Sequence, residues 1–301
     1  MKIKKRYLRY IDKYFKNIKE GITVAISGVT GSTGNALAYY LSYLNCKLVL
    51  LVRNINEGYK LKKELTDLFK NNIDVLYLDY ANKKSVDEAV LSLSKMKIDV
   101  FFNNAGIYHQ PLKLIDNYDI TFYVNFLMPA YLEEKLAKIN SNIKIINTGS
   151  ISYRYLKLNK DDLLKLNEKN RTLRYGNSKR LLMLYTTYKK YLGYNFLLVH
   201  PGISKTNLFA SKNKAYPKIF YVFITPLMKV IFMNPNKAAL SLLKGVNEDN
   251  LSFFKWIGPR GLFHAWGYPN VQAIKEGLLD ELKDKKLLEE VLKIINKEIV
   301  N

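Results

Sequence analysis

A tyrosine and a lysine four positions apart are the first residues here whose types and spacing could do chemistry. Tyr175 and Lys179 fall in a long helical pattern, where positions i and i+4 share a face. A phenol has an ordinary pKa of about 10, and a neighbouring ammonium group lowers that pKa because it favours the phenolate. The pair could therefore exchange a proton near neutral pH, although this spacing alone is weak evidence in a chain with 23 tyrosines.

A glycine-rich turn is the second feature that could do chemistry. It joins a β-branched run to a helical pattern and reads Ser27-Gly28-Val29-Thr30-Gly31-Ser32-Thr33-Gly34. Glycines three apart let the backbone approach a pyrophosphate, and the free N–H groups of a helix N-terminus attract its charge. We therefore predict dinucleotide binding here, the alternative being a turn required only for packing. The predicted phosphate-binding residues are Gly28, Thr30, Gly31, Ser32, Thr33 and Gly34.

The elements that must position these residues alternate along most of the chain. The predicted strands are 22–26, 47–52, 73–78, 99–102, 143–147 and 195–200, and the predicted helices between them are 33–44, 56–70, 83–96, 117–139 and 172–193. Helical crossovers make neighbouring strands parallel. The sequence therefore predicts the α/β fold class, with a doubly wound parallel sheet of Rossmann type in three α/β/α layers.

The two ends of the chain are less regular. Residues 1–20 predict a basic amphipathic N-terminal helix, and residues 21–301 are expected to form a single nucleotide-binding domain. The later elements are expected to be an apolar helical segment over 216–233, a helix over 236–246, an edge strand over 252–257 and two helices between about 270 and 299.

The end of the second predicted strand indicates which dinucleotide is preferred. In a sheet of this type an acidic residue there selects NAD, whereas a basic residue accommodates the 2′-phosphate of NADP. Here Val52 is followed by Arg53 and Asn54, with no acid beside them. The sequence therefore predicts NADP(H) in preference to NAD(H), unless Arg53 is an ordinary surface arginine.

Short motifs at the predicted strand ends carry a resemblance to a known family. They are Asn103-Asn104-Ala105-Gly106, Asn147-Thr148-Gly149-Ser150, Tyr175-Gly176-Asn177-Ser178-Lys179 and His200-Pro201-Gly202-Ile203-Ser204-Lys205-Thr206. With the glycine turn, this ordered set resembles the short-chain dehydrogenase/reductase family over residues 20–250. The separation of 25 positions between Ser150 and Tyr175 is similar to the retinol-dehydrogenase-like branch. Two positions depart from the family pattern: Ser32 replaces a glycine, and Gly149 replaces the first of two serines.

This resemblance implies an oxidoreductase that moves a hydride between nicotinamide and a carbonyl or alcohol substrate, which we expect to be lipophilic. It implies that Tyr175 is the general acid/base and that Lys179 lowers its pKa and holds the nicotinamide ribose. Ser150 is implied to bind the substrate oxygen, and Asn125 to support a water in the proton relay. Further cofactor contacts are implied for Asp79, Tyr80, Asn104, Ala105, Gly106, Pro201, Gly202 and Thr206, and a substrate-lining segment for 205–235.

A non-catalytic NAD(P)-binding sensor or regulatory protein on the same fold is the alternative. Such proteins typically lack the tyrosine or the lysine, and this chain has both.

The composition bears on partners and location. The chain has 48 Lys+Arg and 26 Asp+Glu, a formal charge of +22, but its cations lie along the whole sequence and no nucleic-acid-binding motif accompanies them. We therefore expect no nucleic-acid partner. One cysteine, Cys46, and three scattered histidines predict no metal site. We find no targeting or membrane-spanning segment and expect a cytoplasmic protein, with peripheral membrane contact and homo-oligomerisation left open.

Overall fold

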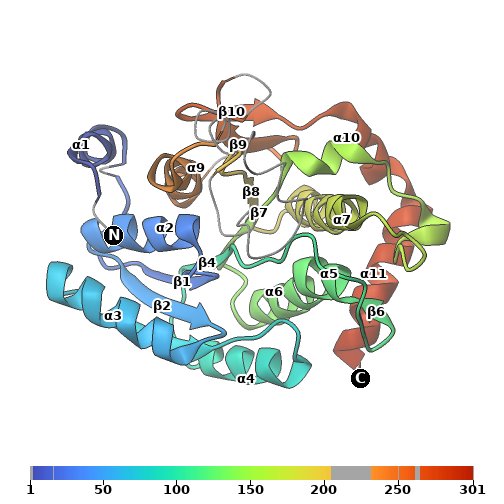
Figure 1. Cartoon of the computed structure of the whole chain (residues 1–301), viewed down its shortest axis with the longest axis horizontal. Helices are drawn as coiled ribbons and strands as arrows, with labels where there is room; N and C mark the ends of the chain where they lie inside the picture. Colours follow the sequence, from blue (N-terminus) through green and yellow to red (C-terminus); the bar gives the residue numbers. More distant parts are fainter. Residues whose placement is uncertain (1–2, 16, 205–231, 250, 262–264, 301) are drawn as a thin grey trace, which may run out of the picture.

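A central eight-stranded sheet organises the molecule (Figure 1). The computed structural model describes residues 3–15, 17–204, 232–249, 251–261 and 265–300. The strands of the sheet, in spatial order, are β10 Pro269–Ala273, β9 Lys255–Pro259, β8 Phe196–Val199, β7 Lys144–Thr148, β4 Val100–Asn103, β1 Thr23–Ser27, β2 Lys47–Val52 and β3 Ile73–Tyr77. Each pairs in parallel with its neighbour except β10, which is antiparallel to β9. The predicted doubly wound sheet is confirmed.

Helices cover both faces of this sheet and bury two apolar cores. On one face lie α2 Ser32–Tyr43, α3 Ile55–Phe69 and α9 Pro235–Asn247; on the other lie α4 Lys83–Ser94, α6 Met128–Ile139, α7 Arg171–Tyr191 and α11 Lys285–Val300. Side chains of a strand alternate between faces, so Ala25 enters one core while Val24 and Ile26 enter the other. Burial on both faces explains why the parallel strands appear in the sequence as continuous apolar runs.

The structure corrects two predicted elements. The helix predicted over 117–139 is divided into α5 Ile120–Phe122, a π-helical turn at Tyr123–Leu127 and α6. The strand predicted over 252–257 is β9, which is not at the edge because β10 pairs with it from Pro269↔Pro259 to Ala273↔Lys255. The region from about 270, predicted to be helical, begins with β10 instead, whose residues Pro-Asn-Val-Gln-Ala lack the apolar alternation of a strand. The two C-terminal helices begin only after it, at α10 Glu276–Lys283 and α11.

The N-terminal helix packs on the domain. It spans α1 Lys5–Tyr14, and the apolar face predicted from the sequence, including Tyr7, Ile11 and the following Phe15, is buried against the core that contains α2 and α9. In the described part of the chain, no helix has both the length and the apolar character needed to cross a membrane. Most of the apolar segment predicted at 216–233 lies outside the described residues.

Candidate active site

The glycine turn between β1 and α2 has a geometry that only glycine permits at two positions. Gly28 has φ +71°, and a Cβ atom added there would lie 2.8 Å from the backbone of Ala105. A Cβ atom at Gly34 would lie 2.4 Å from the Gly28 carbonyl oxygen. Gly31 is the N-cap of α2 and gives it no side-chain cap. The exposed backbone of this turn and the positive end of α2 therefore fit a pyrophosphate.

The loop after β4 is fastened beside this turn. The Ser27 hydroxyl oxygen accepts hydrogen bonds of 3.1 Å from the backbone N–H groups of both Asn104 and Ala105. The Asn104 side-chain amide donates to the Gly28 carbonyl at 3.2 Å. Asn104 and Ala105, two of the predicted cofactor residues, thus lie against the glycine turn.

The segment after β8 also reaches the glycine turn. The hydroxyl oxygens of Thr33 and Ser204 lie 3.4 Å apart in a buried contact. Gly202 has φ +80°, and a Cβ atom there would lie 2.5 Å from the Ala265 carbonyl oxygen, so this backbone is closely packed. Pro201 and Gly202 are placed at the same edge of the sheet as the turn, whereas Thr206 lies outside the described residues.

The ends of β2 and β3 hold the residues predicted to contact the adenosine half of the cofactor. Arg53 follows β2 directly and is exposed. Asp79 follows β3 closely, and its Oδ1 atom accepts a hydrogen bond from the Ala81 N–H. The Tyr80 hydroxyl, in contrast, is buried and donates to Asn103 Oδ1 at 3.2 Å, beneath the site. The Tyr80 side chain is therefore part of the core under the cofactor edge.

The predicted acid/base pair lies on the first turns of α7. Lys179 is 5% exposed, and its Nζ atom donates to the Thr148 carbonyl at the end of β7 at 3.0 Å. A Cβ atom added at Gly106 would lie 3.6 Å from this nitrogen, so Lys179 also borders the loop after β4. Burial lowers the pKa of Lys179 to about 8. Tyr175, one turn earlier, has the Tyr108 ring edge-on at 4.8 Å between centroids.

Ser150 begins the short 3-10 helix Ile151–Tyr155 that follows β7. Its hydroxyl oxygen accepts hydrogen bonds from the Ser152 hydroxyl at 2.8 Å and from the Ser152 N–H at 3.3 Å. Both contacts use Ser150 as an acceptor, so its own O–H can donate to a substrate oxygen. Ser152 was not identified from the sequence, although a serine two positions after an N-cap is a frequent local partner.

Asn125 lies in the π-helical turn between α5 and α6 and is buried. Its Oδ1 atom accepts from the Ile107 N–H at 2.8 Å, and its amide donates to the Ile107 carbonyl at 2.9 Å and to the Ser178 hydroxyl at 3.1 Å. These bonds fix the loop after β4 to α7. The local widening of a π-turn, a frequent feature of functional sites, places the amide there.

A buried ion pair from the C-terminal region supports the catalytic helix and was not predicted. Arg180, next to Lys179, donates through Nε to both carboxylate oxygens of Glu281 on α10, at 2.9 and 2.7 Å. The same guanidinium donates to the Tyr153 carbonyl at 2.6 Å. The ion pair therefore connects α10, α7 and the 3-10 helix that begins at Ser150. Glu281 lies on the short helix α10, where acids usually face solvent, so its burial is not evident from the sequence.

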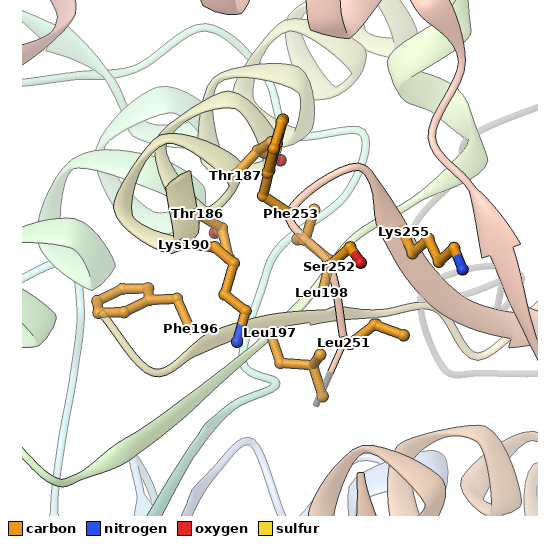
Figure 2. A pocket seen from close by; sticks show the side chains of 10 residues that line it. All are labelled: Thr186, Thr187, Lys190, Phe196, Leu197, Leu198, Leu251, Ser252, Phe253 and Lys255. Carbon is orange, nitrogen blue, oxygen red and sulfur yellow. The ribbon is translucent and has the colours of Figure 1, made fainter. Parts of the chain in front are cut away.

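The other end of α7 borders a small, partly open pocket that is distinct from this site (Figure 2). It has a free volume of about 10 Å³, and Thr186, Thr187, Phe196 and Leu198 are among its lining residues. These threonines lie about 17 Å along the helix axis from Tyr175. A space of this size admits about one water molecule, so it cannot take a nicotinamide or a substrate.

His200 and Cys46 are both buried in the structure. His200 is buried and stacks on Trp256 with ring centroids 5.1 Å apart. Cys46 is buried, which raises its pKa to about 12 and makes the thiolate scarce. Among the side chains that the structure describes, no group of three His, Cys, Asp or Glu is placed to hold a metal ion.

Comparison with known proteins shows what the chain is similar to. Residues 22–155 match the family model described as short chain dehydrogenase. Retinol dehydrogenase 14 of Mus musculus is 29% identical over 212 residues, which cover 64% of this chain and 64% of that protein. The chain therefore matches less than two thirds of this relative's length.

Solved structures share the fold at low sequence identity. An uncharacterised protein from Mycobacterium paratuberculosis has a TM-score of 0.70 and 20% identity, covering 92% of this chain and 94% of its own. A short-chain dehydrogenase from Sphingobium yanoikuyae in complex with NADPH has a TM-score of 0.59 and 17% identity, covering 77% of this chain and 86% of its own.

Proposed function

This chain belongs to the short-chain dehydrogenase/reductase family, and from that premise we propose that it is an NADP(H)-dependent oxidoreductase acting on a carbonyl/alcohol pair. The observation that carries the proposal is the placement of Lys179. Its buried ammonium group is held at the end of β7, between the loop after β4 and the helix turn that carries Tyr175. This is the same edge of the sheet as the glycine turn, where ligands of doubly wound folds bind.

The residues present fit a nicotinamide dinucleotide. Gly28 and Gly34 let the turn pack closely against the loop after β4 and against itself, and the N-terminus of α2, which has no side-chain cap, is available for phosphates. Arg53, exposed after β2 with no acid in the adjoining sequence, supports a preference for the 2′-phosphate of NADP(H). When bound, the nicotinamide supplies or accepts the hydride; every other step falls to the side chains of this protein.

In carbonyl reduction, Tyr175 donates its phenolic proton to the oxygen that gains negative charge, and in alcohol oxidation it takes that proton back. Lys179 stabilises the phenolate because an ammonium charge acts strongly in a buried, low-dielectric position. The Ser150 hydroxyl, already an acceptor for Ser152, donates a hydrogen bond to the same substrate oxygen. Asn125 holds the loop beside Lys179 in place.

We expect a lipophilic substrate. The Tyr108 ring stands edge-on to Tyr175 and offers an aromatic wall to whatever approaches the phenol. The name of the similar mouse protein, retinol dehydrogenase 14, supports the same class of substrate. The segment 205–235, expected to complete the pocket, lies mostly outside the described residues.

We also propose a cytoplasmic protein whose contact with membranes, where it occurs, is electrostatic. The apolar face of α1 is occupied by the domain, so only its exposed cationic face, with Lys5, Arg9 and Lys13, could meet anionic lipid. Sedimentation with anionic vesicles but not with neutral ones is the expected result, and equal sedimentation would contradict it.

A thermal-shift measurement tests the main proposal. NADPH should raise the melting temperature more than NADH does, and Tyr175→Phe should keep that shift while losing at least about 100-fold in turnover over a panel of carbonyl substrates. No stabilisation by either nucleotide would overturn the assignment, and a preference for NADH would overturn the argument from Arg53.

A further inference from the structure

Arg174, the residue before Tyr175 in α7, is a buried cation that the proposed chemistry does not use. It is 4% exposed. Its guanidinium group donates through Nη1 to the Glu168 carbonyl oxygen at 2.7 Å and through Nη2 to the Gln110 carbonyl oxygen at 2.8 Å. Its Nε atom forms an ion pair at 3.4 Å with Oδ2 of Asp119, which is also buried. One side chain therefore joins three other segments of the chain to the helical turn that carries Tyr175.

Stability alone does not account for these contacts of Arg174. A buried ion pair gains little over apolar side chains of the same volume, because both charged groups lose their contact with water. What the guanidinium group adds is direction, since its planar fork holds several acceptors at fixed angles. Its acceptors are the loop after β4, the N-cap of α5 and the segment just before α7. The contacts therefore point to the placement of the residues around the start of α7.

The loop after β4 is held at two points that are three residues apart. At one point, the Ile107 N–H donates to Asn125 at 2.8 Å and the Ile107 carbonyl accepts from it at 2.9 Å. At the other point, the Gln110 carbonyl is bonded to the guanidinium group. Tyr108 and His109 lie between them, and His109 has φ +56°. A left-handed backbone is uncommon outside glycine and persists where the surrounding contacts impose it, often beside functional groups.

This turn sets the Tyr108 ring against the Tyr175 ring. The ring centroids are 4.8 Å apart and the ring planes are at 90°. The Gln110 side chain donates to the Tyr108 carbonyl at 3.1 Å, which closes the turn on itself. Arg174 therefore connects the two rings from both sides: it is adjacent to Tyr175 in the helix, and it is bonded to the residue that closes the turn around Tyr108.

We propose that Arg174 is a positioning residue for the substrate: through Gln110 it holds the Tyr108 ring beside the Tyr175 phenol, so that the two rings form one wall of the substrate site. The inference rests on the proposed function, because it takes Tyr175 as the group that the substrate approaches. Such a wall binds the substrate and the transition state alike, so loosening it raises KM and leaves kcat nearly unchanged. Among the described contacts of Arg174, none reaches the glycine turn, so cofactor affinity should be unaffected.

The test is Arg174→Lys in the full chain. Lysine keeps the positive charge beside Asp119 but lacks the planar fork that reaches the two carbonyl oxygens. The probe is whichever of benzaldehyde, trans-cinnamaldehyde and decanal the native protein reduces fastest with NADPH. Its KM should rise about tenfold, while kcat and NADPH affinity stay within about twofold of the native values. A purely structural role predicts the opposite split, because a less stable protein has fewer active molecules: kcat falls and KM does not change.

Lys189→Arg is the matched control. Lys189 is another buried cation of α7, paired with Glu134 at 2.9 Å, and the substitution exchanges the same two residue types in the reverse direction. It should leave KM unchanged. An equal rise of KM in both variants would overturn the positioning role of Arg174.

A double-mutant cycle tests whether Arg174 acts through Tyr108. Tyr108→Leu should itself raise KM about tenfold, and adding Arg174→Lys to it should raise KM no further, because the wall is already lost. Tyr108→Phe keeps the ring and should keep the native KM. Additive increases would overturn the inference, and so would a native KM in Tyr108→Leu, a measurement that applies even if Arg174→Lys does not fold.

The outcomes separate the inference from the proposed function. If the native protein reduces an aldehyde and Arg174→Lys has the native KM, the positioning role is overturned while the oxidoreductase proposal stands. If the native protein binds NADPH but reduces none of the aldehydes, the lipophilic substrate and the positioning role are both overturned, and cofactor binding stands. If it does not bind NADPH either, the proposed function is overturned as well.

Discussion

The cofactor half and the catalytic half of the sheet edge are built in different ways. Around the glycine turn, position is set by backbone: Gly28 and Gly34 leave no space for a Cβ atom, and the loop after β4 is bonded to β1 through Ser27. Around α7, position is set by buried charged groups, with Arg180 bound by Glu281 and Lys179 bonded to the Thr148 carbonyl.

Because of this difference, we expect the two halves to tolerate different kinds of substitution. Backbone packing is sensitive to added volume and indifferent to charge, whereas a buried ion pair is sensitive to the loss of either charge. Volume changes should therefore act on the cofactor half, and charge changes at constant volume should act on the catalytic half. The following substitutions test that division.

The largest effect is expected for Glu281→Gln. The substitution keeps the volume but leaves the buried Arg180 guanidinium without a countercharge, so the free energy of unfolding should fall by about 3 kcal/mol. Turnover should fall as well, since Arg180 also holds the carbonyl of Tyr153, three residues after Ser150. Urea unfolding and substrate assays measure the two effects.

Asp280→Asn is the control for this prediction. It neutralises the residue before Glu281. Asp280 forms an ion pair with Lys283 in which both side chains are exposed, so the unfolding free energy should change by less than about 0.5 kcal/mol. Equal losses in the two variants would show that the buried pair has no special role in the catalytic half.

A smaller effect, confined to cofactor binding, is expected for Gly34→Ala. The added Cβ atom would lie 2.4 Å from the Gly28 carbonyl oxygen, so the turn must open, and NADPH affinity should fall by about 10- to 100-fold. Gly277→Ala adds the same methyl group on α10 at an ordinary contact distance of 3.5 Å from Arg180 and should leave affinity unchanged. Calorimetric titration of both variants would decide, and native affinity in Gly34→Ala would refute the backbone argument.

The two halves also differ in how far sequence could predict them. Strands, strand ends and the glycine turn follow from local signals: β-branched runs, helical periodicity and glycine spacing. Local signals also predict that Tyr175 and Lys179 share a helix face, whereas Ser150 was added to them by the resemblance to family motifs. The edge strand β10 was not predicted, because its five residues show no apolar alternation and its pairing with β9 is a tertiary contact.

The buried charges could not be predicted for a related reason. Glu281 of α10 and Glu133 of α6 are buried carboxyl groups on helices, where acids usually face solvent, and their partners Arg180 and Asn103 come from distant segments. One signal was available for Glu133: it falls four residues before Ala137 and three after Ala130, on a stripe that is otherwise apolar and buried. A carboxylate on an apolar stripe indicates a buried polar network, but the sequence alone does not say with which residues.

The smallest effect is expected at Arg53. Substituting it tests whether this one side chain selects the cofactor, or whether the cofactor is attracted by the positive field of the whole chain, whose formal charge is +22. Arg53→Glu should weaken NADPH binding and strengthen NADH binding, changing their affinity ratio by about tenfold, because an acid at the end of β2 favours an unphosphorylated ribose. Lys63→Glu, on the exposed face of α3, makes the same change in net charge. If the field of the whole protein attracts the cofactor, both variants should lower NADPH affinity alike and leave the ratio unchanged. If only Arg53→Glu changes the ratio of NADPH to NADH affinity, then the choice of cofactor is made by this one side chain, at the border of the cofactor half.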